Sequence, residues 1–212
     1  MSDWLNLTFK SFDGATFDFM NGLAHAGKDF FNPFFEFVSL FGKGGIFFIL
    51  LSIILMLFKK TRFGGFAILL SIGIGALFTN VIIKNAVARP RPYTVNEYKE
   101  YWVLAGKCVE SEFSFPSGHT TVTMASMTAL FLTFNKKYSW SAFVFVFIMG
   151  FARVYLIQHY LTDVIVGIIV GGVASVGAYF IAKKLFKIIN SHENKFCCFV
   201  KNADLINLFK KK

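Results

Sequence analysis

Cysteine and proline are scarce in this chain of 212 residues, which contains three of the first and four of the second. So few cysteines exclude a disulfide framework, because Cys108 stands alone and Cys197 and Cys198 are adjacent near the C-terminus. We therefore interpret them as bystander thiols rather than as redox or lipidated sites. The first thirty residues lack a basic start followed by an apolar stretch, so they do not resemble a cleavable signal peptide.

Acidic residues are also few, 12 against 22 Lys and Arg, which gives a formal net charge of +10. The basic residues do not gather on one soluble face, so no nucleic-acid partner is expected. They lie instead between and after apolar stretches, mainly at 59–62, 136–137 and 183–212. By the positive-inside rule these loops and the C-terminus are cytoplasmic. The mostly acidic segment before residue 41 favours an outside N-terminus.

Hydrophobic residues make up 55% of the chain, which has 29 Phe and a mean hydropathy of +0.57. This is too apolar for a soluble protein. A membrane helix needs about 20 mostly apolar residues, and five runs qualify: 44–58 (reaching back to about 34), 64–83, 118–134, 138–157 and 164–182. Residues 16–41 are interrupted by charges and Pro33, which suits helices at the membrane interface better than a span. We predict an all-α, polytopic membrane helix bundle with five to six transmembrane helices.

The chain is expected to form one membrane domain with two flanking segments. Residues 1–30 are predicted to be an amphipathic interfacial segment, 31–186 the membrane-embedded domain, and 187–212 a basic cytoplasmic tail. The tail mixes Phe, Ile and Leu with Lys at helical spacing, which fits a helix on anionic lipid or a solvated tail. The polar segment 85–116 is too long for a simple turn and is a candidate lid or binding loop.

Ionisable residues gather at the ends of the predicted spans on the outer face. Lys84 and Arg91 follow the second span, Ser117, Gly118 and His119 begin the third, Arg153 ends the fourth, and His159 and Asp163 open the fifth. Each has a simple structural alternative, such as a snorkelling lysine or an N-capping serine. Their convergence on one face is nevertheless typical of a functional site, because such residues are costly in a membrane.

The chemistry of this cluster points to an anion. Three fixed positive charges would repel a cation, so a zinc site built from His119, His159 and Asp163 is a poor alternative. Phosphate fits best, since arginine forks and a helix N-terminus bind its oxygens. One imidazole can then attack phosphorus and the other protonate the leaving oxygen, and the spacing of four gives His159 a carboxylate partner in Asp163. A transporter that grips phosphate without cleaving it is a further alternative.

Three motifs carry a family resemblance: KNAVARPRP (84–92), PSGH (116–119) and RVYLIQHYLTD (153–163). With them the sequence resembles the type-2 phosphatidic acid phosphatases, which are related to vanadium haloperoxidases and bacterial acid phosphatases. The resemblance covers about 32–186 and includes the order of the helices. It departs at Ala152, where the family often has Ser.

The resemblance implies a role for each matching residue. His159 would be the nucleophile that forms a phosphohistidine, Asp163 would orient it, and His119 would protonate the leaving group. The phosphoryl oxygens would be held by Lys84, Arg91, Ser117, Gly118 and Arg153, without metal or other cofactor.

The expected substrate is a lipid phosphate or diphosphate displayed in the outer leaflet. Undecaprenyl diphosphate is the first choice, because small bacterial members of this layout commonly recycle that carrier and Arg89 could contact a second phosphate. Phosphatidic acid or phosphatidylglycerophosphate phosphatase activity, or a lipid phosphotransferase using the same site, are the alternatives. The aromatic residues Tyr98, Tyr101 and Trp102 predict either seating at the membrane interface or a plain structural loop.

Overall fold

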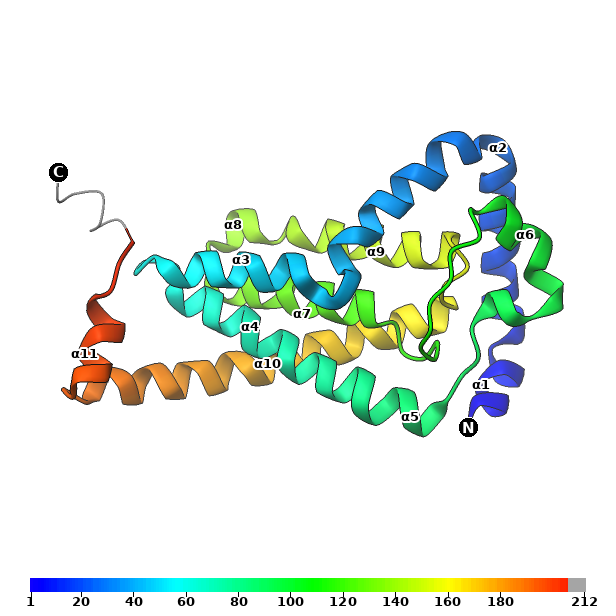
Figure 1. The fold of residues 1–212 in the computed structure, drawn as a ribbon. Helices are drawn as coiled ribbons and strands as arrows, with labels where there is room; N and C mark the ends of the chain where they lie inside the picture. Colours follow the sequence, from blue (N-terminus) through cyan, green and yellow to red (C-terminus); the bar gives the residue numbers. More distant parts are fainter. Residues whose placement is uncertain (206–212) are drawn as a thin grey trace.

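The computed structural model describes residues 1–205, apart from the side chains of 196 and 199, and this part of the chain is helical without strands. Five helices with roughly aligned axes form a bundle (Figure 1): α3 (Ile46–Leu57), α4 (Arg62–Ala76), α7 (Gly118–Thr133), α9 (Ala142–Tyr155) and α10 (Leu161–Ser191). The π-helical η2 (Leu77–Ile83) and α5 (Lys84–Val87) extend α4 toward one end of the bundle. That end carries the polar residues singled out in the sequence.

Small residues let the two central helices approach closely. A Cβ atom on Gly167 of α10 would lie 2.8 Å from the Ser117 carbonyl oxygen, and one on Gly171 would come closer still to the Thr121 carbonyl oxygen. Such small-xxx-small spacing is typical of packed membrane helices. Because of this approach, the Ser117 N–H at the start of α7 donates to the Asp163 carbonyl at 3.0 Å. The packing therefore brings two of the three sequence motifs together.

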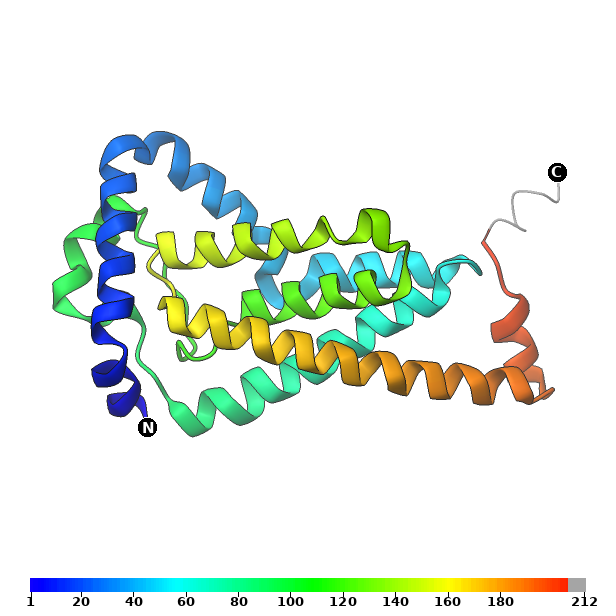
Figure 2. The same ribbon diagram turned by 180° about the vertical axis from the view of Figure 1, so that it is seen from behind.

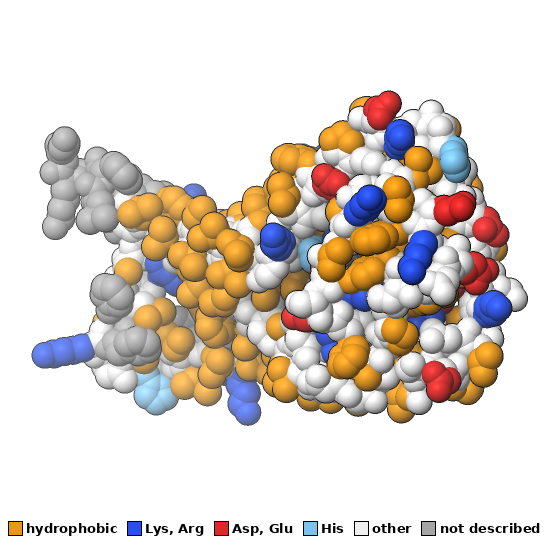
Figure 3. Space-filling view, turned by 45° about the vertical axis from the view of Figure 1, so that its right-hand side comes forward, with side chains coloured by type: hydrophobic (Ala, Val, Ile, Leu, Met, Phe, Trp, Pro, Cys, Tyr) orange, Lys and Arg blue, Asp and Glu red, His pale blue; other side chains and the backbone are white. Residues whose placement is uncertain are grey.

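An apolar surface surrounds the bundle, whereas charged side chains gather over the end with the polar residues (Figure 3). Among the described residues, four helical stretches are long and apolar enough to cross a membrane: Lys10–Leu57, Arg62–Thr94, Lys136–Tyr155 and Leu161–Ser191. The remaining predicted span corresponds to α7, which has only 16 residues and packs against α4, α9 and α10. The predicted all-helical, multi-pass membrane architecture is confirmed, and five to six crossings stay a prediction.

The N-terminal helices lie across the end of the bundle rather than along it (Figures 1 and 2). They are α1 (Ser2–Thr8) and the first part of α2 (Lys10–Gly42), which is kinked at Gly27 before it descends to the 3-10 helix η1 (Lys43–Gly45). Phe17, Met20 and Ala24 are buried on this first part, and the Phe17 ring packs 5.7 Å from that of Tyr160. The predicted segment boundary at residue 30 falls inside α2.

The segment between α5 and α7 folds over the same end. It contains η3 (Pro92–Thr94), η4 (Asn96–Tyr98) and α6 (Lys99–Leu104). Tyr101 is buried and donates to the Tyr155 carbonyl, while Tyr98 packs on Phe17 with ring centroids 4.7 Å apart. These contacts favour the structural alternative for the aromatic residues, because they attach the segment to the bundle.

The opposite end carries the C-terminal elements and the short α8 (Lys136–Ser139). After α10 the chain turns into α11 (Lys195–Asn202), and the Arg62 guanidinium donates to the carbonyls of Val200 and Ala203. The three cysteines are unpaired. The predicted basic tail, 187–212, is described only as far as residue 205. Its last three lysines lie outside the described residues.

Candidate functional site

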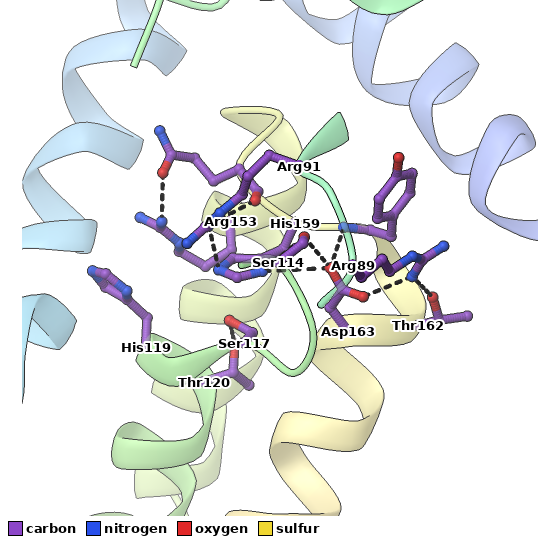
Figure 4. A network of polar contacts seen from close by, with 12 residues as sticks. Arg89, Arg91, Ser114, Ser117, His119, Thr120, Arg153, His159, Thr162 and Asp163 are labelled. Carbon is purple, nitrogen blue, oxygen red and sulfur yellow. Dashed lines mark hydrogen bonds and ion pairs between the residues drawn. The ribbon is translucent and has the colours of Figure 1, made fainter. Parts of the chain in front are cut away.

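The structure brings the predicted site residues together at the end of the bundle where α5, α7, α9 and α10 meet. A cavity of about 590 Å³ is lined by Lys84, Gly118, His119 and His159 together with Glu110. Arg91 and Arg153 contact Glu110. Asp163 lies beside His159 (Figure 4). The convergence inferred from the order of the helices is therefore present in the fold.

His159 lies on the turn between α9 and α10 and is 1% exposed. Its Nδ1 is 3.5 Å from Asp163 Oδ2, and its Nε2 is 3.0 Å from Arg91 Nη1. Since a guanidinium can only donate, Nε2 must accept and carries the lone pair. The ring proton is then on Nδ1, which faces the Asp163 carboxylate.

Asp163 lies close to His159, but the two residues do not share one helical face as their spacing of four predicted. His159 precedes α10, whereas Asp163 is the third residue of that helix, and its Oδ2 accepts the Tyr160 N–H at 3.1 Å. This is capping geometry at a helix N-terminus. The carboxylate is thus turned back toward the residue before the cap.

Ser114 is a site residue that the sequence interpretation missed. Its hydroxyl donates to Asp163 Oδ2 and lies 3.5 Å from His159 Nδ1, and the residue is fully buried. It stands outside the three motifs, in the loop before α7, so no spacing rule pointed to it. With the Tyr160 N–H, Ser114 fixes the Asp163 oxygen that faces the imidazole.

Arg91 and Arg153 form a buried cradle that holds the Glu110 carboxylate. Arg153 Nη2 donates to Glu110 Oε1 and to Gln158 Oε1, while Arg91 Nη2 lies 2.9 Å from Glu110 Oε2. Burial by itself raises the pKa of Glu110, but the Arg153 guanidinium and the other cationic groups around it outweigh burial and lower the pKa to about 2. Glu110 is therefore an anion at neutral pH.

The carboxylate does not use all the donors of this cradle. Within residues 1–205, Arg91 Nη2 and Arg153 Nε are buried atoms without a hydrogen-bonded acceptor, although Arg91 Nη2 is close to Glu110. Buried guanidinium donors normally find acceptors. A group with more oxygens than a carboxylate would fit the same cradle better.

Lys84 and the first turn of α7 form the adjoining wall. Lys84 Nζ pairs with Glu112, and a Cβ on Gly118 would lie 3.8 Å from that nitrogen. The Ser117 N–H was expected to face an anion, but it donates to the Asp163 carbonyl, and the Ser117 hydroxyl accepts from Thr120 at 3.0 Å. Gly118 and His119 supply the free N–H groups of a helical first turn.

His119 faces the gap from the side opposite Asp163 (Figure 4). Its Nδ1 is 3.9 Å from Glu110 Oε1, and its side chain is 14% exposed. Gly42, at the end of α2, allows this placement, because a Cβ there would lie 2.6 Å from His119 Cδ2. The two histidines thus flank the position held by the Glu110 carboxylate.

Arg89 does not join the cradle, contrary to the suggestion that it contacts a second phosphate. It is 1% exposed and lies on the far side of Asp163 from His119 (Figure 4). Its three guanidinium nitrogens donate to protein oxygens of Asn6, Asp13, Thr162 and Asp163. Within the described part of the chain, no group of three or more His, Cys, Asp or Glu is arranged to hold a metal ion.

These features define a multi-pass helical membrane protein with a buried anion cradle between two histidines at one end of its bundle. Residues 64–187 match the family model described as PAP2 superfamily, and the chain belongs to this family. The family predicted from the three motifs is thereby confirmed.

Several curated relatives are phosphatases by name. The chain is 28% identical over 141 residues to an undecaprenyl-diphosphatase from Sulfolobus acidocaldarius, covering 66% of this chain and 65% of the relative. It is 32% identical to the undecaprenyl-diphosphatase BcrC of Bacillus subtilis, covering 47% and 50%, and 31% identical to a lipid A 4'-phosphatase of Porphyromonas gingivalis, covering 53% and 48%. The matches thus span about half to two thirds of these relatives.

Solved structures share the fold. The PAP2-type phosphatidylglycerolphosphate phosphatase of Bacillus subtilis superposes with a TM-score of 0.62 at 24% identity, covering 86% of this chain and 88% of that one. LpxE of Aquifex aeolicus gives a TM-score of 0.56 at 23% identity, covering 76% and 92%. At these identities the likeness extends to the fold alone.

Proposed function

We propose that this protein is a membrane-embedded lipid phosphatase that hydrolyses a phosphate or diphosphate ester through a phosphohistidine intermediate. One observation carries the proposal: a buried cradle, in which Arg153 Nε has no acceptor among the described residues, lies beside an imidazole nitrogen that bears a lone pair. A phosphoryl group offers three oxygens to the cradle and an electrophilic phosphorus to the imidazole.

In the first step, His159 Nε2 attacks phosphorus and the bond from phosphorus to the leaving oxygen breaks. His119 donates a proton to that oxygen, and Asp163 holds the Nδ1 proton of the attacking ring. Arg91, Arg153 and Lys84, with the N–H groups of Gly118 and His119, stabilise the charge on the phosphoryl oxygens. No step needs a metal.

In the second step, water attacks the phosphohistidine and gives its proton to His119, which is now a base. The nitrogen–phosphorus bond breaks, inorganic phosphate leaves, and both histidines regain their starting protonation states. Before this cycle the Glu110 carboxylate has to leave the cradle, because it occupies the space between Arg91, Arg153 and His119.

Undecaprenyl diphosphate is our preferred substrate. The argument from Arg89 no longer supports it, since that side chain is committed to protein partners. Support comes instead from the two relatives named undecaprenyl-diphosphatase. From the positive-inside pattern we infer that the site faces the extracytoplasmic side and that the C-terminus is cytoplasmic, so the lipid would be taken from the outer leaflet.

The other relatives favour specific alternatives. A lipid A 4'-phosphatase and a phosphatidylglycerolphosphate phosphatase are phosphomonoesterases by name. A phosphotransferase would use the same intermediate with an alcohol in place of water. These alternatives share one reaction and differ in the lipid substrate or in the phosphate acceptor, which is water or an alcohol.

The test is phosphate release by the purified full chain in detergent micelles from undecaprenyl diphosphate, phosphatidic acid and phosphatidylglycerophosphate, with His159→Ala as the inactive control. We expect the diphosphate to give the highest kcat/KM. A higher value for a monoester would overturn the substrate assignment. Absence of release from all lipids, or lipid movement across vesicles that persists in His159→Ala, would overturn the phosphatase assignment in favour of a transporter.

The acceptor is tested in the same reaction by adding a competing alcohol. Hydrolysis gives inorganic phosphate as the main product, whereas a phosphotransferase gives mainly the phosphorylated alcohol.

A further inference from the structure

A buried carboxylate on the N-terminal helix belongs to the structure that supports the site. Asp13 is 2% exposed, although it lies on α2, which crosses the end of the bundle. Its Oδ2 accepts from Arg89 Nη2 at 3.0 Å and from the Thr162 hydroxyl at 2.9 Å. Its Oδ1 accepts the Thr162 backbone N–H at 3.0 Å.

The Thr162 contact makes Asp13 a cap for another helix. Thr162 is the second residue of α10, and the N–H groups of a first helical turn have no acceptor within their own helix. Asp13 supplies that acceptor from α2, with a negative charge at the positive end of the helix dipole. The cap is one residue away from Asp163.

Arg89 connects the two buried carboxylates. Its Nη1 donates to Asp163 Oδ1 at 2.7 Å, while its Nη2 donates to Asp13, and its Cζ lies 3.7 Å from the centre of the Tyr160 ring. A second N-terminal residue, Asn6 of α1, accepts from Arg89 Nε at 2.8 Å. The guanidinium is therefore fixed on two sides by the N-terminal helices.

The charges of Arg89, Asp13 and Asp163 explain how the Asp13 carboxylate can influence His159. If Arg89 paired with Asp163 alone, its charge would largely neutralise the carboxylate that faces His159. With Asp13 present, one positive charge is shared between two negative ones, so the buried group keeps a net charge of −1. That charge stabilises positive charge on the imidazole, which develops as Nε2 attacks phosphorus.

We propose that Asp13 is a positioning residue for the histidine nucleophile: through Arg89 and the α10 cap it fixes Asp163 and keeps that carboxylate effective toward His159. The N-terminal helices are then part of the catalytic apparatus and not an accessory membrane anchor. This inference rests on the proposed phosphatase function.

The test compares Asp13→Asn with Asp18→Asn in the full-length protein. Asn keeps the shape and one oxygen that can accept the Thr162 backbone N–H. It removes the charge and replaces the oxygen that accepts from Arg89 and from the Thr162 hydroxyl. Asp18 is an exposed residue of the same helix. We expect kcat for lipid hydrolysis to fall about ten- to a hundredfold in Asp13→Asn, the range that follows loss of an outer hydrogen-bond partner around a metal-bound histidine. KM is expected to stay within about twofold, because Asp13 does not touch the cradle, and Asp18→Asn should match the wild type.

The pH profile separates positioning from a structural role. Protonated His159 cannot attack, so activity falls at low pH, and removing a nearby negative charge moves that fall to lower pH. The other groups that face His159 are unchanged in the variant: Lys84, Arg91, Glu110, Ser114, Arg153 and Asp163. A merely structural defect would lower activity or stability without moving the profile.

The outcomes distinguish this inference from the proposed function. A wild-type protein that releases no phosphate refutes the phosphatase, whereas active wild type with equal kcat in Asp13→Asn and Asp18→Asn refutes the role of Asp13. If Asp13→Asn does not fold, Asn6→Ala replaces it, since it frees Arg89 Nε without removing a charge. In that variant a drop in kcat at constant KM supports the inference, and wild-type kcat overturns it.

Discussion

Replacing Glu110 by Gln tests whether the acidic loop competes with the substrate. The Glu110 carboxylate contacts Arg91 and Arg153 between the two histidines, so the proposed phosphate has to displace it. Hydrogen bonds to charged groups contribute about 1.5–3 kcal/mol each. Rehydration of the freed groups and the gain in loop freedom offset part of this, leaving a displacement cost of about 1–2 kcal/mol, or roughly 5- to 30-fold in affinity.

Glu110→Gln keeps the shape of the side chain and removes its charge. We expect KM for the lipid and the inhibition constant of inorganic phosphate to fall by about tenfold, with kcat nearly unchanged. The assay is steady-state phosphate release in mixed micelles. Glu100→Gln on α6 is the matched control, because Glu100 is exposed in the same segment between α5 and α7.

The competition between the Glu110 carboxylate and the substrate phosphate should not depend on pH in the neutral range. The pKa of Glu110 is lowered from 4.5 to about 2, so the ion pairs are complete above pH 4.5 and are lost only as pH falls through about 2. The ratio of wild-type to variant KM is therefore expected to be constant at neutral and alkaline pH. Unchanged KM, or a fall in kcat with higher KM, would refute the reasoning and assign Glu110 a supporting role in the reaction.

Two further predictions concern the histidines. His159→Gln is expected to abolish both phosphate release and the acid-labile phosphoenzyme that labelled substrate gives with the wild type; turnover in this variant would exclude His159 as nucleophile. His119→Asn is expected to slow formation of the phosphoenzyme from the lipid by about 10²–10⁴, the usual contribution of a general acid, but to have much less effect on its formation from an aryl phosphate, whose leaving group needs no proton. The rate of phosphoenzyme formation is measured in a single turnover of purified protein, because His119 also acts as the base in the later hydrolysis, and equal losses on both substrates in this step would contradict the acid role.

The membrane bundle and the gathering of the motifs could be predicted because both depend on local signals. Long apolar runs fix the helices, and the order of the helices along the chain brings Lys84, His119 and Asp163 to one end of the bundle. The short α7 shows the limit of this reasoning. A helix surrounded by others does not need the length of one that faces lipid along its whole course.

The partners of the site could not be predicted, since they come from segments without any fixed spacing to the motifs. Asp13 lies on a helix far away in the sequence, and Glu110 lies on an irregular loop whose path depends on tertiary packing. Arg89 lies two residues before Arg91 in the first motif, and from the sequence it was suggested to contact a second phosphate. The direction of its side chain, toward Asp13 and Asp163, is a property of the fold alone.

Arg91 contacts both the Glu110 carboxylate and the proposed nucleophile, His159. Its Nη2 lies at the Glu110 carboxylate, and its Nη1 donates to the lone pair of His159 Nε2. While Glu110 is in the cradle, the nucleophile is thus occupied by a hydrogen bond. A phosphoryl group that replaces the carboxylate offers Arg91 more oxygens, which draws the guanidinium from the imidazole and frees Nε2 beside phosphorus. Glu110 and Glu112 also offset the mutual repulsion of Arg91, Arg153 and Lys84 before substrate arrives, which accounts for acidic side chains at the centre of a basic site.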